Sequence, residues 1–249
     1  MTTAKAENNP SSLIAANQSQ VTDVASKSTA VARATIETSM GELFSIAADA
    51  KYRSGSDANQ ALVAIVFSII AMDATLNDLM AFCSFPSVVE KSPLLGQLSE
   101  ELKQLDQRRA NLVTRLEKIH EVLTRAALDK KSEPWKGLQC LAQIRNEITH
   151  RQAITGVMHG NSLTGLTVDR VKRNFQPYLI SKGLISERET IEFPWQYSVK
   201  KPNVAEWALD TCIDCVERVF LLLPDSQPRR SLMSEFTDRV KGFRSSRPG

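Results

Sequence analysis

Three side chains that could act together on a phosphodiester lie within the six residues RNEITH, residues 145–150. A histidine with a pKa near neutrality can take the proton from a ribose 2′-hydroxyl or give one to the leaving 5′-oxygen. An arginine can hold the non-bridging phosphate oxygens as charge builds in the transition state. Arg145 and His150 are therefore suited to RNA cleavage without a metal, and Asn146 could orient the histidine or the phosphate.

The residues around this motif have the periodicity of an amphipathic helix, which we expect from about residue 134 to residue 151. Its apolar positions form one stripe that faces the core, made of Leu138, Leu141, Ile144 and Ile148. Its polar positions form a second stripe on roughly the opposite side, made of Gln139, Gln143, Asn146 and His150. The polar stripe points away from the core of a single chain. A homodimer would make use of it, because two such helices could meet across a two-fold axis and line one basic cleft.

The R-x4-H spacing occurs twice in the chain, as Arg145/His150 and as Arg115/His120. The second pair lacks an asparagine after the arginine and lies within a heptad-like segment, so we expect it on a solvated helix face. For the first pair, the ordinary alternative is the polar end of a helix with no chemical role. Spacing alone does not separate the two possibilities.

The motif and one upstream segment resemble a known family. RNEITH resembles the R-N-x3-H form of the R-x4–6-H motif of HEPN domains, helical domains of many prokaryotic toxins, anti-phage systems and RNA-processing proteins. IIAMDATLNDL, residues 69–79, resembles the apolar helix of such proteins that often carries an acidic residue followed by asparagine. The resemblance covers about residues 58–223.

The resemblance implies an up-and-down helical bundle that forms a homodimer, with a metal-independent endoribonuclease site shared between protomers. Arg145 and His150 match the catalytic pair of the motif, and Asn146 matches its polar residue. Asp73, with Asn77 one turn later, matches the acidic support that would orient Arg145, although glutamate is commoner in the family.

The expected partners follow from the same resemblance. RNA is the expected substrate, with Gln143, Arg151 and Arg173 as weaker RNA contacts, and no metal or organic cofactor is expected. An antitoxin or a nucleotidyltransferase-type protein is a possible partner. Two alternatives stay open, namely a non-catalytic helical module that binds RNA or protein, and a regulatory subunit of a two-component system.

Charge gives weak support for a polyanion near the motif. The chain has a formal net charge of +3, and residues 101–151 carry eleven basic and seven acidic groups. A solvated helix face often has the same composition, so this excess fits either explanation. The segment VKRNFQPYL, residues 171–179, also mixes basic and aromatic residues, and burial of Phe175 and Tyr178 is favoured there over stacking on RNA.

Cysteine usage and hydropathy favour a cytoplasmic protein. The four cysteines occur in a chain that starts without a secretory leader, which favours reduced thiols. Cys212 and Cys215 form one C-x2-C in mid-helix, so we expect buried core cysteines rather than a zinc or redox site. The longest apolar run, residues 61–72, is too short to span a bilayer, and we expect a fully buried core helix and no membrane association.

The periodic segments predict a mainly α fold, a helical bundle with a small β-hairpin or loop insert before the last helix. Residues 1–40 form a flexible or loosely helical extension, residues 41–223 the helical domain with its insert at about 152–203, and residues 224–249 a basic tail. The expected helices cover about residues 40–51, 57–82, 98–127, 134–151 and 204–223, with a short one near 168–184.

Overall fold

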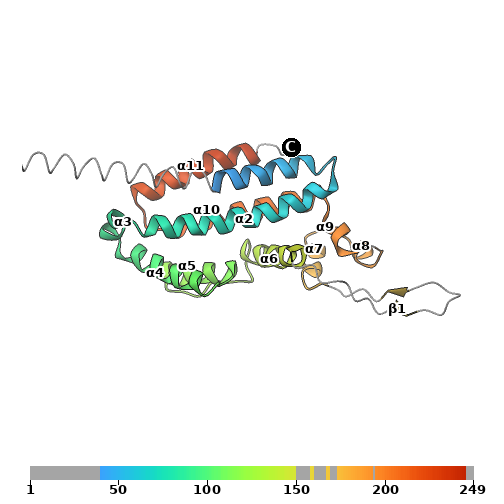
Figure 1. Cartoon of the computed structure of the whole chain (residues 1–249), viewed down its shortest axis with the longest axis horizontal. Coiled ribbons are helices and arrows are strands. Elements are labelled where there is room, and N and C mark those ends of the chain that lie inside the picture. The colour runs from blue at the N-terminus through green and yellow to red at the C-terminus, as the bar shows by residue number, and fades with distance from the viewer. Residues whose placement is uncertain (1–39, 150–157, 160–166, 169–172, 193, 245–249) are drawn as a thin grey trace, which may run out of the picture.

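A computed structural model of the chain describes residues 40–149, 158–159, 167–168, 173–192 and 194–244 (Figure 1). This part of the chain is mainly helical, as the sequence predicts. A first helix covers residues 40–53. The helices that follow are α2 (Ala58–Cys83), α3 (Pro86–Lys91), α4 (Pro93–Gln107), α5 (Leu112–Thr124), α6 (Trp135–Thr149), α7 (Gln176–Ser181), α8 (Glu187–Glu192), α9 (Trp195–Val199), α10 (Pro202–Leu222) and α11 (Gln227–Arg244).

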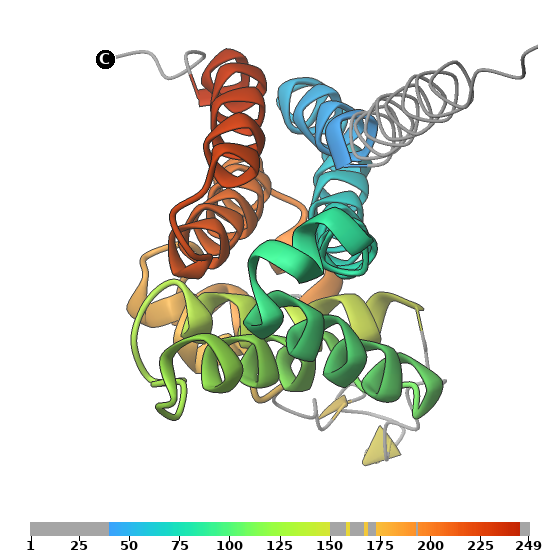
Figure 2. The same ribbon diagram turned by 90° about the vertical axis from the view of Figure 1, so that its left-hand side faces the viewer.

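The long helices lie in three tiers. In Figure 1 the first helix and α11 form the upper tier, α2 and α10 the middle one, and α4, α5 and α6 the lower one. Figure 2 shows the same arrangement from one end, with α4 and α5 side by side below α2. The contact between α2 and α10 is the most extensive between any two elements, so these helices form the spine of the core.

Helix α2 starts where the sequence predicts. The side chain of Asp57 accepts a hydrogen bond from the backbone N–H of Asn59 and caps the helix. Its inward face is apolar and inaccessible, with Ile65, Ile69, Met72 and Leu76 all at 0% exposure. The prediction of a fully buried helix is wrong, however, because Ile70 on the outward face is 40% exposed.

By length and composition α2 could also cross a membrane. Its most apolar window has a mean hydropathy of 1.7, and 56% of that window is buried inside the protein. Core helices of soluble proteins pass the same test, so this helix alone indicates no membrane location.

The predicted long helix over residues 98–127 is two helices, α4 and α5. The chain turns at Arg109, which has a positive φ of 53°, and α5 then starts behind Asn111, whose side chain accepts from the N–H of Thr114. Both helices bury their heptad-like leucines, including Leu98, Leu102 and Leu116. The turn falls at the position where the apolar repeat skips.

The predicted basic tail is in large part a helix, α11. Phe236 anchors it, with 2% exposure. The Phe236 ring lies 5.9 Å from the ring of Phe44 in the first helix and 5.7 Å from that of Phe220 in α10. The segment therefore closes the upper tier of the bundle instead of extending away from it.

The insert before α10 contains the expected hairpin pairing. Strand β1 (Met158–His159) pairs antiparallel with β2 (Thr167–Val168), with Met158 opposite Val168. Three short helices, α7, α8 and α9, follow before α10. Residues 1–39 of the predicted extension, which was residues 1–40, and the rest of the hairpin lie outside the described residues.

Candidate functional site

Helix α6 presents the motif as its periodicity predicts. Leu138, Leu141 and Ile144 are at most 1% exposed and pack into the core, while Gln143 and Asn146 are exposed. Gly137 allows the close approach of this helix to its neighbours, because a Cβ there would meet Thr211 Cγ2 at 3.0 Å. The polar stripe of α6 is thus accessible up to Thr149, where the described part of the helix ends.

Arg145 lies half-buried at the edge of this stripe. Its Nε is buried and has no hydrogen-bond partner. The hydroxyl of Thr149 donates to the carbonyl of Arg145 at 3.0 Å, which holds the last turn of the helix. His150 and Arg151 lie outside the described residues.

Asp73 and Asn77 bind a different arginine from the one expected. Arg115 donates from Nη1 to Asp73 Oδ1 at 2.8 Å and from Nη2 to Asn77 Oδ1 at 2.6 Å. The spacing of Asp73 and Asn77 correctly predicts that both acceptors lie on one face of α2. At these two residues, however, that face contacts α5 and not Arg145 of α6. The expectation that Asp73 orients Arg145 is therefore wrong, since its ion pair is with Arg115.

Arg115 also corrects the expectation for the second R-x4-H pair. It is 3% exposed, so it is no part of a solvated face. Both of its Nη atoms are used by acceptors on α2, which leaves them little capacity for a phosphate. His120 is half-buried, and its Nδ1 lies 3.0 Å from the carbonyl oxygen of Ala126 just beyond α5. In this second pair, Arg115 connects α5 to α2, and His120 contacts the C-terminal end of its own helix.

Arg173, predicted as a weak RNA contact, forms an ion pair within the protein. Its Nη1 lies 3.1 Å from Glu147 Oε2, and its backbone N–H donates to Gln176 Oε1 at 2.8 Å. The pair connects the last turn of α6 to the segment that leads into α7. Phe175 and Tyr178 are 2% and 8% exposed, which confirms their burial.

Sequence reasoning missed Asp78, which lies on α2 directly after Asn77. The side chain is 9% exposed, and its Oδ2 has no hydrogen-bond partner. Burial raises the pKa of this carboxyl to about 6. The only sequence signal was an aspartate in the stretch ATLNDLM that is otherwise nearly uncharged.

The cysteines are core residues, as expected. All four are free and buried, and burial raises the pKa of the Cys83 thiol to about 12 and the pKa of Cys212 further. Among the residues that the structure describes, no group of three or more histidine, cysteine, aspartate or glutamate side chains could hold a metal ion.

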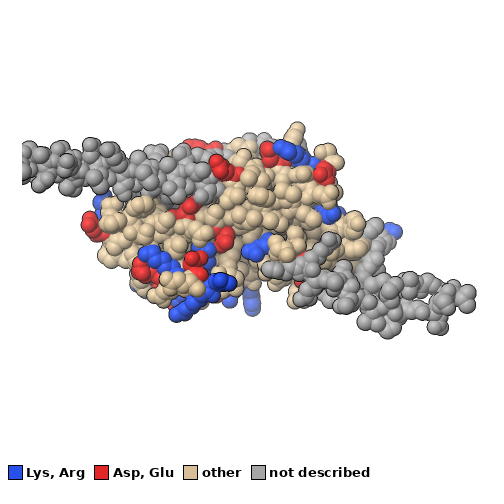
Figure 3. Space-filling model, in the orientation of Figure 1, with Lys and Arg blue, Asp and Glu red and all other residues tan. Residues whose placement is uncertain are grey.

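The charged face over α4 and α5 carries both signs. Figure 3 shows Lys and Arg intermixed there with Asp and Glu, whereas the surface over α2 is largely uncharged. Two ion pairs involve α5: Lys118 lies 2.8 Å from Glu121 within the helix, and Lys130, beyond its end, lies 2.7 Å from Glu117. The basic excess of residues 101–151 is thus spread over a mixed surface.

Comparison with known proteins found no matching family model, no matching curated protein and no matching solved structure.

Proposed function

We propose that the chain is a HEPN-like, metal-independent endoribonuclease that acts as a cytoplasmic homodimer. The observation that carries the proposal is the described part of the RNEITH motif, residues 145–149, at the end of α6, with Arg145 half-buried and Asn146 exposed. In the described part of the chain, no carboxylate pairs with the Arg145 guanidinium, which favours an anionic ligand there.

The proposed reaction needs three roles. His150 takes the proton from the ribose 2′-hydroxyl, and the oxygen then attacks the adjacent phosphorus. Arg145 stabilises the negative charge that builds on the non-bridging oxygens, and Asn146 orients the phosphate. The bond from phosphorus to the 5′-oxygen breaks, and the protonated His150 gives its proton to that oxygen. The products are a 2′,3′-cyclic phosphate and a free 5′-hydroxyl, and no metal takes part.

The biological role that fits such a site is that of a toxin, an anti-phage effector or an RNA-processing factor. A cognate antitoxin or a nucleotidyltransferase-type protein would then control it. The competing proposal is a non-catalytic module that binds RNA or protein through the same helix.

The first experiment is cleavage of a labelled total RNA pool in EDTA. We expect activity in the wild type, a loss of about 100-fold or more in His150→Ala and in Arg145→Ala, and wild-type activity in His120→Ala. His120 is the matched control because it ends the second R-x4-H pair. The 3′ ends should accept a ligated adaptor only after the cyclic phosphate has been opened and the resulting phosphate removed. Equal activity in all four proteins would overturn the proposal, and RNA binding without cleavage by the wild type would favour the binding module.

A further inference from the structure

The motif lies beyond the part of α6 that is fully buried in the core. Ile144 is the last described residue of α6 that is fully buried, at 0% exposure, and the motif starts with the next residue. From Arg145 to Thr149 every side chain is half-buried or exposed, and Ile148 packs against the edge of the core. The last carbonyls of a helix also lack partners within the helix, so its last turn opens easily unless other contacts hold it. The position of the motif therefore depends in part on polar contacts.

One such contact is the ion pair of Glu147, which belongs to the motif, with Arg173. The Nη1 atom of Arg173 lies 3.2 Å from Glu147 Oε1 and 3.1 Å from Glu147 Oε2. The side chain of Arg173 is 24% exposed and that of Glu147 is 34% exposed, so water screens this pair only in part. The Nε atom of Arg173 is buried and has no hydrogen-bond partner. The guanidinium is therefore stabilised mainly by the carboxylate of Glu147.

The core fixes Arg173 on its other side. Its backbone N–H donates to Gln176 Oε1 at 2.8 Å, and Gln176 is 5% exposed. Phe175 is 2% exposed, and its carbonyl accepts from the Cys140 thiol in the middle of α6 at 3.9 Å. This segment is thus packed beside α6, and Glu147 binds the last turn of the helix to it.

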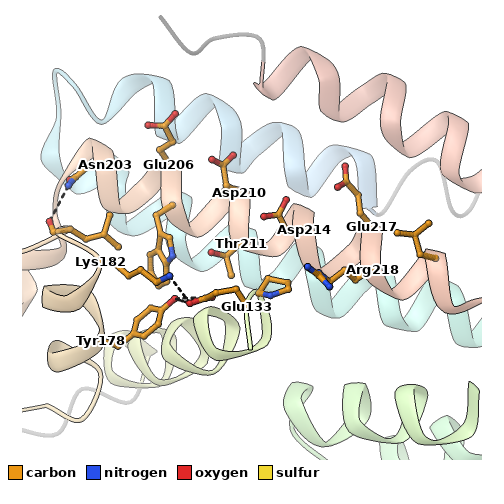
Figure 4. Close-up of a pocket in the computed structure, with 14 residues that line it drawn as sticks. Glu133, Tyr178, Lys182, Asn203, Glu206, Asp210, Thr211, Asp214, Glu217 and Arg218 are labelled. Atoms are coloured by element: carbon orange, nitrogen blue, oxygen red, sulfur yellow. Dashed lines mark hydrogen bonds and ion pairs between the residues drawn. The ribbon is translucent and has the colours of Figure 1, made fainter. Parts of the chain in front are cut away.

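The start of α6 is held to the region of α7 by a separate contact. Figure 4 shows this contact, which lies in a groove of about 1070 Å³ along α10. Glu133, two residues before α6, accepts from Tyr178 Oη at 2.9 Å and pairs with Lys182 at 2.7 Å. Carboxylates thus fasten both ends of α6 to the same part of the chain, and the one at Glu147 lies within the motif.

We propose that Glu147 and Arg173 are positioning residues of the endoribonuclease site, because their ion pair holds the last turn of α6 in the conformation that the reaction requires. The effect on the reaction rests on the proposed function. Residues two apart lie about 160° from each other around a helix, so Arg173 binds α6 from the side away from Arg145. Displacement of a catalytic group by about 1 Å can lower the rate up to about 100-fold, so loss of the pair should slow the chemical step.

The alternative is that Arg173 contacts RNA directly, as its charge alone suggests. The two roles predict different kinetics. A positioning pair makes Glu147→Ala and Arg173→Ala lower kcat alike, with KM nearly unchanged. A direct contact would be lost in Arg173→Ala alone, which would then raise KM and leave Glu147→Ala active.

The test combines RNA cleavage in EDTA with amide hydrogen exchange, both on the full chain. The cleavage probe is a fluorescent single-stranded RNA that carries one site cut in the total RNA pool. We expect kcat to fall about tenfold in Glu147→Ala and in Arg173→Ala. Glu147→Arg with Arg173→Glu should recover at least about threefold of this loss, because opposite charges face each other again. Hydrogen exchange in the last turn of α6 should be at least about tenfold faster in the single variants than in the wild type.

The variants should stay folded, because a partly exposed ion pair contributes little to stability. Their melting temperatures should fall by no more than about 4 °C. Glu117→Ala is the matched control, since Glu117 on α5 is also 34% exposed and pairs with Lys130 at 2.7 Å. It should change kcat and the exchange of α6 by less than about twofold.

Unchanged hydrogen exchange in both single variants would contradict the proposal, whether or not the wild type cleaves RNA. Faster exchange with unchanged kcat would also contradict it, because the pair would then be a structural contact without effect on the site. A loss confined to Arg173→Ala, with a raised KM, would make Arg173 an RNA contact instead. Faster exchange in both variants, with no cleavage by the wild type, would support the holding contact and overturn the proposed function alone.

Discussion

Asp78 is a carboxyl group that the bundle buries without a hydrogen-bond partner for its Oδ2. Its pKa of about 6 lies above the value of about 3.9 in an unfolded chain. At pH values below the unfolded pKa the group is neutral in both states and costs nothing. As the pH rises from the unfolded pKa through the folded pKa, the carboxyl ionises more readily in the unfolded state than in the folded one. The free energy of unfolding therefore decreases over this range.

We predict that Asp78→Asn stabilises the protein, and that the gain increases with pH. The difference in free energy of unfolding from the wild type should grow by about 1 kcal/mol between pH 5 and pH 8 and then level off. Urea unfolding across this range measures it. Asp106→Asn makes the same change at an exposed position on α4, so it serves as the control and should not stabilise the protein. A flat profile for Asp78→Asn would mean that water reaches the carboxyl.

The residue scale also shows what spacing can predict and what it cannot. The face of each residue on α6 followed from a period of 3.6, and so did the common face of Asp73 and Asn77 on α2. The residue that binds that face could not be predicted in this way, because Arg115 lies 42 residues from Asp73 in the chain. A helical period says which side chains share a face and nothing about the helix that the face meets.

At the scale of elements, the contact of Arg115 with Asp73 and Asn77 fastens α5 to α2. The side chain of Arg115 is 4% exposed, and that of Asp73 is 44% exposed. Water can therefore solvate the carboxylate of Asp73, whereas the charge of Arg115 is stabilised mainly by its hydrogen-bond partners. Removing the carboxylate would leave a buried guanidinium with the Asn77 amide alone.

We predict that Asp73→Ala lowers the free energy of unfolding by about 2 kcal/mol. Replacing both partners, as Asp73→Ala with Arg115→Leu, should cost less than the sum of the single changes, with a coupling of about 1 to 2 kcal/mol. Thermal or urea unfolding of the four proteins completes this cycle. Asp49→Ala breaks a surface pair with Arg53 and should cost less than about 0.5 kcal/mol.

This cycle also separates the observed partner of Asp73 from the one that the sequence predicted. If Asp73 acted through Arg145, Asp73→Ala would reduce RNA cleavage in protein that remains folded. The structure leads us to expect unchanged cleavage per folded molecule. Additive costs of the two single substitutions would contradict the structural role of the Arg115 contact.

Helix boundaries were predictable where the apolar period is long, as in α2, which Asp57 also caps, and in α10, which starts at a proline without a side-chain cap. The break between α4 and α5 was missed because a left-handed Arg109 leaves the apolar repeat nearly intact on both sides. Helix α11 was missed for the opposite reason: its composition is polar, and among its described side chains Phe236 is the one that is fully buried. Both errors concern features that depend on single residues rather than on a periodic pattern.

At the scale of the whole molecule, charge is distributed unevenly. The lining of the groove along α10 holds five acidic and two basic side chains, whereas the whole chain has a net charge of +3, so the rest of the chain is the more basic part. The RNA of the proposed function is therefore expected at the end of α6 and not at this groove.

The last prediction concerns the homodimer that the proposed shared cleft needs. Ile70 is 40% exposed on α2, a helix that packs against α6, and Figure 3 shows that the visible surface over α2 is largely uncharged. We expect this surface to be covered in the dimer, because exposed apolar side chains on a wide uncharged face favour association. Sedimentation at micromolar concentration should give a dimer for the wild type and a dissociation constant at least about tenfold weaker for Ile70→Glu.

Tyr52→Glu is the control, because Tyr52 is an exposed large side chain, at 82%, on the first helix, away from α6. It should leave the dimer intact. If the cleft is shared, mixing Arg145→Ala with His150→Ala should restore part of the cleavage that each protein lacks, because each mixed dimer retains one arginine and one histidine. A monomeric wild type would contradict the shared cleft, and so would a dimer whose mixtures stay inactive. Either result would mean that Arg145 and His150 act within one protomer and that the polar stripe of α6 need not face a second copy.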